Sequence, residues 1–200
     1  MSIGKQSESN AYKNWQCYAS TIEKLLSESC ATDGSGLEMD MDSALALWRD
    51  AAIKCREQGE IVFVGNGASA SIASHCAADI MKNACITTRV FTDLSMLTAM
   101  GNDEGYEKVF MLPIQQCMKN TDMLVAISSS GRSPNILHAV SAARKKGAYI
   151  ATVSAFSEDN PLRNFGDCNI FVQTHSYGLA ESCHAAILHC WMDMLTTNRI

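Results

Sequence analysis

Short apolar segments alternate with segments of helical periodicity along most of the chain, and this alternation limits the folds available to it. A strand–helix–strand order predicts right-handed crossovers and a mostly parallel sheet with helices on both faces. We therefore predict an α/β protein, built as a three-layer sandwich. The predicted strands have the sequences EIVFVG, TTRVFT, DMLVAIS, YIATVSA and CNIFVQT, at residues 60–65, 87–92, 122–128, 149–155 and 168–174.

Helices are predicted between these strands and ahead of them. Before the first strand, apolar residues at helical spacing predict a helix over 11–29, and Asp40 or Asp42 can cap a second helix that ends at Gln58. The segment 30–40 between them is predicted to be a loop. The remaining predicted helices span 68–83, 113–119, 134–146 and 179–196, with a short helix from 94 that stops at a Gly-Asn-Asp turn at 101–103.

The length and composition of the chain restrict its class and its partners. Its 200 residues are expected to form one domain, with a helical segment at 1–58 and an α/β core at 59–200. A net charge of −5 argues against nucleic acid or an anionic membrane as a partner. No apolar run approaches the length of a membrane-spanning helix, and no signal peptide is recognisable. The nine cysteines include no Cys-x-x-Cys pair, which favours reduced thiols and a cytoplasmic protein.

Two of the predicted strands end in turns built from glycine and serine, VGNGASAS and ISSSGRS. The carboxyl ends of parallel strands lie at one edge of a sheet, so these turns are expected close together. Free amides at the helix starts favour a phosphate, and serine hydroxyls add neutral donors. The alternative is ordinary N-capping, for which serine, asparagine and glycine are common. The residues singled out for phosphate or substrate are Asn66, Gly67, Ser69, Ser128, Ser129, Ser130 and Ser133.

Two predicted helices carry imidazole and carboxylate side chains at spacings that bring them onto one helical face. His75 and Asp79 are four residues apart, while Glu181 and His189 on the last helix are about 80° apart around its axis. One imidazole and one carboxylate from each helix make a candidate divalent-metal site. The alternative is that each pair is a surface or capping pair. His184 is expected to be a helix histidine without a role in the site.

Four separate stretches of the sequence resemble the sugar isomerase (SIS) domain family. Within that family they are similar to the sedoheptulose-7-phosphate isomerases, also called phosphoheptose isomerases, and the resemblance covers nearly the whole chain. It implies a flavodoxin-like sheet, a phosphosugar held at the serine turn, and a homotetramer. The stretches are FVGNGASASIASHCAADI, TDLSMLTAMGNDEGYEKVF, LVAISSSGRSPNILHAVSAARKKGA and ESCHAAILHCW.

The resemblance also implies roles for individual residues. The family holds zinc through a histidine and a glutamate on the first helix and a glutamine and a histidine on the last, which correspond to His75, Asp79, Glu181 and His189. Zn²⁺ is the expected metal, although two carboxylates also suit Fe²⁺ or Mn²⁺. Asp79, Glu181 and His189 are the expected catalytic residues. Asp93 is expected near the substrate hydroxyls, with capping of the following helix as its alternative.

The sequence departs from the family pattern at several positions. Asp79 replaces a glutamate, Glu181 replaces a glutamine, and Arg132 stands where asparagine is usual. The stretch SYGLAES also differs from the Thr-Ala-Arg-Ile-Gln that precedes the last helix in the heptose enzymes. We interpret these differences as marks of a divergent branch. Arg132 would either pair with the phosphate or another acid group, or lie in solvent.

The expected reaction is the aldose–ketose isomerisation of sedoheptulose 7-phosphate to glycero-manno-heptose 7-phosphate through a cis-enediol. It needs a base for the carbon-bound proton and an electrophile for the developing oxyanion, which a metal ion can supply. The alternatives are a non-catalytic SIS protein that binds a phosphosugar or a replication initiator, and a sugar-sensing regulator, for which no DNA-binding segment is visible. A related initiator-binding branch lacks the last-helix histidine, which this chain keeps at His189.

Overall fold

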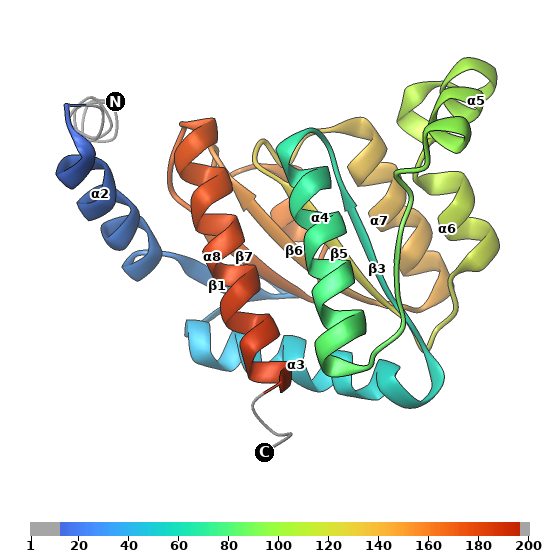
Figure 1. Cartoon of the computed structure of the whole chain (residues 1–200), viewed down its shortest axis with the longest axis horizontal. Coiled ribbons are helices and arrows are strands. Elements are labelled where there is room, and N and C mark those ends of the chain that lie inside the picture. Colours follow the sequence, from blue (N-terminus) through green and yellow to red (C-terminus); the bar gives the residue numbers. More distant parts are fainter. Residues whose placement is uncertain (1–12, 197–200) are drawn as a thin grey trace.

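The computed structural model describes residues 13–196. Within this range seven strands form one sheet in the order β2-β1-β7-β6-β5-β3-β4 (Figure 1). The five neighbouring strands β7-β6-β5-β3-β4 are all parallel, and their order is that of a flavodoxin-like sheet. The predicted fold class is therefore confirmed. The strands are β1 (Cys30–Asp33), β2 (Glu38–Met39), β3 (Ile61–Gly65), β4 (Thr88–Val90), β5 (Met123–Ser128), β6 (Tyr149–Ala155) and β7 (Cys168–Val172).

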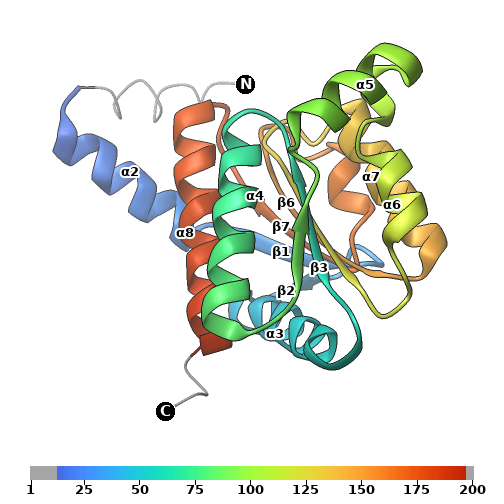
Figure 2. The ribbon, with the colours of Figure 1, turned by 45° about the vertical axis from the view of Figure 1, so that its right-hand side comes forward.

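Helices cover both faces of the sheet and make it the middle of three layers (Figure 2). One face carries α3 (Met41–Gln58), α4 (Ala68–Asp79) and α8 (Tyr177–Thr196), and the other carries α6 (Met111–Cys117) and α7 (Pro134–Lys146). Side chains along each strand alternate between the two cores. In β3, for example, Ile61 and Phe63 pack into the first core while Val62 and Val64 pack into the second. Burial on both faces explains why the strands appear in the sequence as continuous apolar runs.

The helix that precedes β3 is anchored by a cap and by an aromatic contact. Oδ1 of Asp40 accepts a hydrogen bond from the Ser43 amide at 2.8 Å, so Asp40 is the cap and α3 ends at Gln58 as predicted. Its Trp48 is fully buried and meets Trp191 of α8 edge to face, with ring centroids 5.7 Å apart. This contact fixes α3 against α8, the helix that carries half of the candidate site.

The first helix, α2 (Trp15–Ser27), is held less firmly than the others. Residues 11 and 12 of the predicted helix lie outside the described part of the chain. Leu25 is its one buried side chain, and Tyr18 and Ile22 pack partly against the core. Trp15 is 77% exposed, and Figure 1 shows α2 leaning away from the body of the molecule.

The prediction of a loop over 30–40 was wrong, because β1 and β2 form a hairpin there. β1 pairs antiparallel with β7, with Cys30 opposite Phe171, and extends the sheet beyond its parallel part. The carboxylate of Asp33 holds the hairpin turn by accepting the amides of Ser35 and Leu37 at 2.8 and 3.0 Å. The segment ahead of β3 is therefore not wholly helical, since it contributes these two strands.

Several predicted helix bounds also differ from the structure. For example, α6 and α8 both begin two residues before the predicted positions 113 and 179. The Gly-Asn-Asp turn predicted at 101–103 was wrong, because α5 (Leu94–Glu104) continues through it and ends at Gly105, whose φ of +91° few other residues adopt. After α4 a π-helical turn, Ile80–Ala84, completes the predicted helix. No helix in residues 13–196 combines the length and apolar character needed to cross a bilayer. All nine cysteines are free thiols.

Candidate active site

The two glycine–serine turns meet at the carboxyl edge of the sheet, as predicted. They follow β3 and β5, which are neighbouring parallel strands with Gly65 beside Ile127. In this strand order the pair β3/β5 is the point where the chain changes direction across the sheet, the usual ligand position in such folds. A cavity of about 130 Å³ lies between the turns. Its lining comprises Asn66, Ser69, Ile127, Ser128, Ser129, Ser130, Ser133, Tyr177 and Glu181. We call it the serine pocket.

The turns have backbone geometry that requires glycine. Gly67 has φ of +55° and Gly131 has φ of +60°. A Cβ on Gly131 would come within 2.0 Å of Oδ1 of Asn160, a fully buried side chain. A Cβ on Gly65 would lie 2.7 Å from the carbonyl of Ser69. Gly65 therefore permits a close approach to the backbone of Ser69, and Gly131 permits a close approach to the side chain of Asn160.

The capping alternative does not account for the serines at the second turn. Ser133 occupies the N-cap position of α7 but its side chain makes no capping hydrogen bond, and Gly67 at the start of α4 has no side chain to cap with. Pro134 gives α7 no first amide, and Oδ1 of Asn135 accepts the Ile136 amide at 3.0 Å. The starts of both helices nevertheless lie at the pocket, because Ser69 and Ser133 line it, so the positive ends of their dipoles face this region. This arrangement is the one that binds anions at helix starts.

Asn66 holds the turn after β3 against the start of α7. Its amide nitrogen donates to Oδ1 of Asn135 at 3.0 Å, and the Asn135 amide donates back to Oδ1 of Asn66 at 2.8 Å. The hydroxyl of Tyr106, from the short 3₁₀ turn Tyr106–Lys108, also donates to Oδ1 of Asn66 at 3.2 Å. Asn66 lines the pocket and supports its wall at the same time.

Three of the four predicted metal ligands lie next to one another on α4 and α8. Nε2 of His75 is 3.5 Å from Oδ2 of Asp79, and the His75 and His189 rings are 5.1 Å apart. Both members of the His75–Asp79 pair are open to solvent, with side chains 53% and 37% exposed. Glu181 stands apart in the serine pocket, because it precedes His189 by eight positions, which correspond to about 12 Å along the helix.

The fit of this group to a metal ion is partial. Two imidazoles and a carboxylate are donors that suit a divalent ion such as Zn²⁺. Within residues 13–196, however, no group of three or more His, Cys, Asp or Glu side chains is arranged to hold one. Asp79 and His189 line a second cavity of about 190 Å³, further along the two helices than the serine pocket.

Three other predicted positions have structural partners. Asp93 caps α5, accepting the Met96 amide at 3.0 Å, and does not line the serine pocket. Arg132 pairs with Asp159 at 2.8 Å and does not line the pocket either. His184 is fully buried, with its Nε2 3.2 Å from the Ser154 carbonyl, and burial lowers the pKa of its imidazole to about 4. His184 is thus a buried, neutral histidine of α8, and its Nδ1 has no hydrogen-bond partner within residues 13–196.

A model of the SIS domain family matches residues 18–155 of the chain. The chain belongs to the SIS domain family. It is 32% identical over 152 residues to a phosphoheptose isomerase from Syntrophotalea carbinolica, across 72% of this chain and 76% of that protein. It is 35% identical over 150 residues to one from Solidesulfovibrio magneticus, across 72% of each.

Solved structures agree with this assignment at the level of the fold. The phosphoheptose isomerase of Neisseria gonorrhoeae superposes with a TM-score of 0.76 at 23% identity, over 90% of this chain and 96% of that one. The predicted family and enzyme class, an isomerase, are confirmed. The match to the SIS model ends before α8, so Glu181 and His189 lie outside it.

Three residues at the serine pocket of this SIS domain were not predicted as site residues. Asn135 and Tyr106 bond to Asn66, and Tyr177 lines the pocket one helical turn before Glu181. No local pattern could have revealed them, because each comes from an element distant in sequence from the turn it meets. The unusual stretch SYGLAES, which contains Tyr177, was the one available signal.

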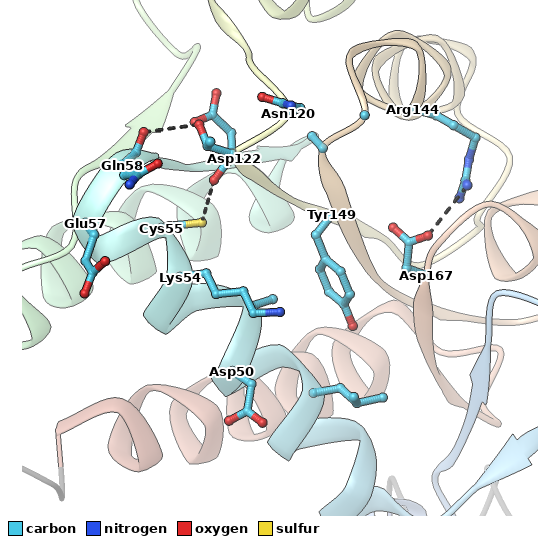
Figure 3. A pocket seen from close by; sticks show the side chains of 15 residues that line it. Asp50, Lys54, Cys55, Glu57, Gln58, Asn120, Asp122, Arg144, Tyr149 and Asp167 are labelled. Carbon is cyan, nitrogen blue, oxygen red and sulfur yellow. Dashed lines mark hydrogen bonds and ion pairs between the residues drawn. The ribbon is translucent and has the colours of Figure 1, made fainter.

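A cavity larger than the serine pocket lies at the opposite edge of the sheet (Figure 3). It has a volume of about 840 Å³ and lies where α3 approaches the starts of β5 and β6. Figure 3 shows Lys54 and Tyr149 extending toward the same space, beside the Arg144–Asp167 pair, whose closest atoms are 3.6 Å apart. It contains none of the predicted site residues, so its size alone does not make it the active site.

Proposed function

We propose that this SIS domain is a phosphosugar isomerase that converts sedoheptulose 7-phosphate to glycero-manno-heptose 7-phosphate. The observation that carries the proposal is that the serine pocket and the His75–Asp79–His189 group share the helices α4 and α8. Ser69 and His75 are six residues apart on α4, which corresponds to about 9 Å along the helix. That separation is comparable with the length of an extended seven-carbon sugar phosphate.

The phosphate would bind at the serine side of the pocket. Among the described residues that line the pocket there is no lysine or arginine, so hydroxyls, turn amides and the positive ends of α4 and α7 would balance its charge. Glu181 lines the same pocket and would repel a phosphate placed beside it. The carboxylate therefore favours an orientation in which the phosphate faces Ser128–Ser130 and the sugar carbons face Glu181.

Proton transfer would be carried out by side chains of α4 and α8. Isomerisation moves a proton between C1 and C2, so a base must reach the carbon and a donor must serve the oxygens. We assign Asp79 and His189 as the acid–base pair and Glu181 as the alternative base. The phosphate anchored at the serines would supply binding energy that positions the reacting carbons.

A divalent metal, with Zn²⁺ as the first candidate, would be held by His75, Asp79 and His189. Glu181, predicted as a fourth ligand, lines the serine pocket instead and is not placed in this group. When bound, such an ion acts as a Lewis acid that stabilises negative charge on the sugar oxygens. His75 would serve the site as a ligand, and its contacts with Asp79 and His189 support that role.

We also propose that the protein is a homotetramer. The exposed Trp15 and the single buried side chain of α2 support this, since an amphipathic helix of that kind is stabilised by packing against another surface. Light scattering coupled to size-exclusion chromatography would measure the mass directly. A monomeric mass at micromolar concentration would contradict the assembly.

A non-catalytic phosphosugar-binding protein is the second candidate. It is favoured by the absence, within residues 13–196, of three metal-ligating side chains arranged around one point. Conversion of sedoheptulose 7-phosphate by the purified protein, measured before and after chelation and after addition of Zn²⁺, separates the two. Turnover that falls on chelation and returns with Zn²⁺ supports the isomerase. Saturable binding with no turnover under any metal condition supports the second candidate.

A further inference from the structure

The serine pocket has an aromatic wall at its outer end. Tyr177, the first residue of α8, lines the pocket together with Glu181 one turn later. Its side chain is 62% exposed, and its ring meets Phe156 edge to face with centroids 4.8 Å apart, so Phe156 favours one position of the ring. Tyr177 thus places an aromatic ring, paired with Phe156, beside the pocket.

The residue that holds Tyr177 has a strained backbone. Phe156 has φ of +67°, a conformation that residues with a Cβ rarely adopt. It follows directly after β6, and its amide donates to the carbonyl of Thr174 at 2.9 Å, which ties the end of β6 to the segment before α8. Its ring also stacks on His175 at 6.0 Å. Strain of this kind persists where the surrounding structure fixes it, and it gathers at ligand sites.

The size of the pocket indicates what the ring would touch. A cavity of about 130 Å³ has room for a phosphate group and little more. The carbon chain attached to a phosphate at the serines would therefore extend beyond the cavity, and Glu181 and Tyr177 are the lining residues of α8 that it can meet. A phenol ring carries no charge to attract the phosphate, but its face can pack against C–H groups and its hydroxyl can bond a sugar hydroxyl.

We infer that Tyr177, held by Phe156, is a specificity-determining residue that positions the sugar carbons next to the phosphate. This inference rests on the proposed phosphosugar ligand and deepens it. Tyr177 would distinguish a sugar phosphate from a bare phosphate, whereas the serines bind the part that both have in common. The Phe156 ring acts through Tyr177 and is a positioning residue.

Calorimetric titration with two probes, sedoheptulose 7-phosphate and inorganic phosphate, tests the inference. Tyr177→Ala is expected to raise the Kd for sedoheptulose 7-phosphate about tenfold and to leave that for phosphate within about twofold. Tyr177→Phe keeps the ring and should retain most of the affinity, and Phe156→Leu should give an intermediate loss. Phe165→Ala, which removes an exposed aromatic ring outside the pocket lining, is the matched control.

Failure of this inference and failure of the proposed function give different results. Equal losses for the two probes, or no loss for either, would overturn the role of Tyr177. A wild-type protein that binds sedoheptulose 7-phosphate without converting it would contradict the isomerase while leaving Tyr177 testable by the same titrations. Where turnover occurs, Tyr177→Ala should raise KM and leave kcat largely unchanged, which a general loss of folding would not do. A wild-type protein that binds neither probe would contradict both proposals.

Discussion

Asn66 and Asn135 exchange two side-chain hydrogen bonds, of 3.0 and 2.8 Å, across the two turns that form the serine pocket. The residues are 69 positions apart in the sequence, and Asn135 is almost fully buried in the first turn of α7. This reciprocal pair fixes the distance between the turn after β3 and the helix after β5. The pocket therefore depends on the pair as well as on the serines.

Asn135→Ala should weaken both the fold and the pocket. The variant leaves the Asn66 amide without its partner, so the free energy of unfolding should fall by about 1–3 kcal/mol in urea denaturation. The KM for the phosphosugar should rise, because the first turn is no longer held beside the second. Asn102→Ala removes an exposed side chain bonded to its neighbour Asp103 and serves as the control. Unchanged stability and KM would show that the pair is not needed.

Gly131→Ala tests the geometry of the serine turn. A Cβ there would meet Asn160 at 2.0 Å in addition to the strain of a positive φ, so we expect a loss of about 3 kcal/mol and of phosphate binding. Gly36→Ala is the matched control, since Gly36 also has positive φ but nothing lies within 4 Å of an added Cβ. It should cost about 1 kcal/mol. Equal losses in the two variants would mean that the contact with Asn160 contributes nothing.

His184 should make the stability of the protein depend on pH. Burial lowers the pKa of the folded-state imidazole to about 4, so the unfolded chain binds more protons between pH 4 and 6.5 and stability falls as pH falls through that window. The loss should be on the order of 3 kcal/mol, complete near pH 4. His184→Gln removes the titrating group, and urea denaturation across this range should show a flatter profile than wild type. Parallel profiles would contradict the assignment.

Arg132→Asn should have little effect on ligand affinity. The guanidinium pairs with Asp159 and does not line the serine pocket, and Ser157 bonds to the same carboxylate. The KM for the phosphosugar should stay within about twofold, because an exposed ion pair contributes little. Ser130→Ala, made alongside it, should raise KM clearly. A rise of about tenfold or more for Arg132→Asn would show that the guanidinium leaves Asp159 to bind the phosphate.

Much of the fold was predictable because its strands are buried on both faces. β6 lies within its predicted bounds because a continuous apolar run marks the strand. α7 does so because Pro134 marks its start and Gly147 its end. The hairpin of β1 and β2 was not predictable. Its strands have four and two residues, too few to show alternation, and β1 is stabilised by pairing with β7, which is distant in the sequence.

The candidate site was predictable where a local motif carries it. The glycine and serine turns follow apolar strands, and His75 and Asp79 have the spacing of one helical turn. Glu181 and His189 were predicted to converge from their angular separation around the helix axis, without their separation along that axis. In the structure the two side chains line different cavities. Asn135, Tyr106 and Tyr177 could not be found from sequence patterns, because their roles arise from contacts between separate elements.

We propose above all that proton transfer to and from a phosphosugar occurs beside α4 and α8. Incubation of sedoheptulose 7-phosphate with the protein in D₂O, followed by NMR, tests it most directly because an enediol intermediate exposes the transferred proton to solvent. We predict formation of the aldose phosphate with deuterium at the transferred position, and loss of both in Asp79→Asn and His189→Ala. Saturating substrate that stays unconverted and free of deuterium with the wild-type protein would contradict the claim.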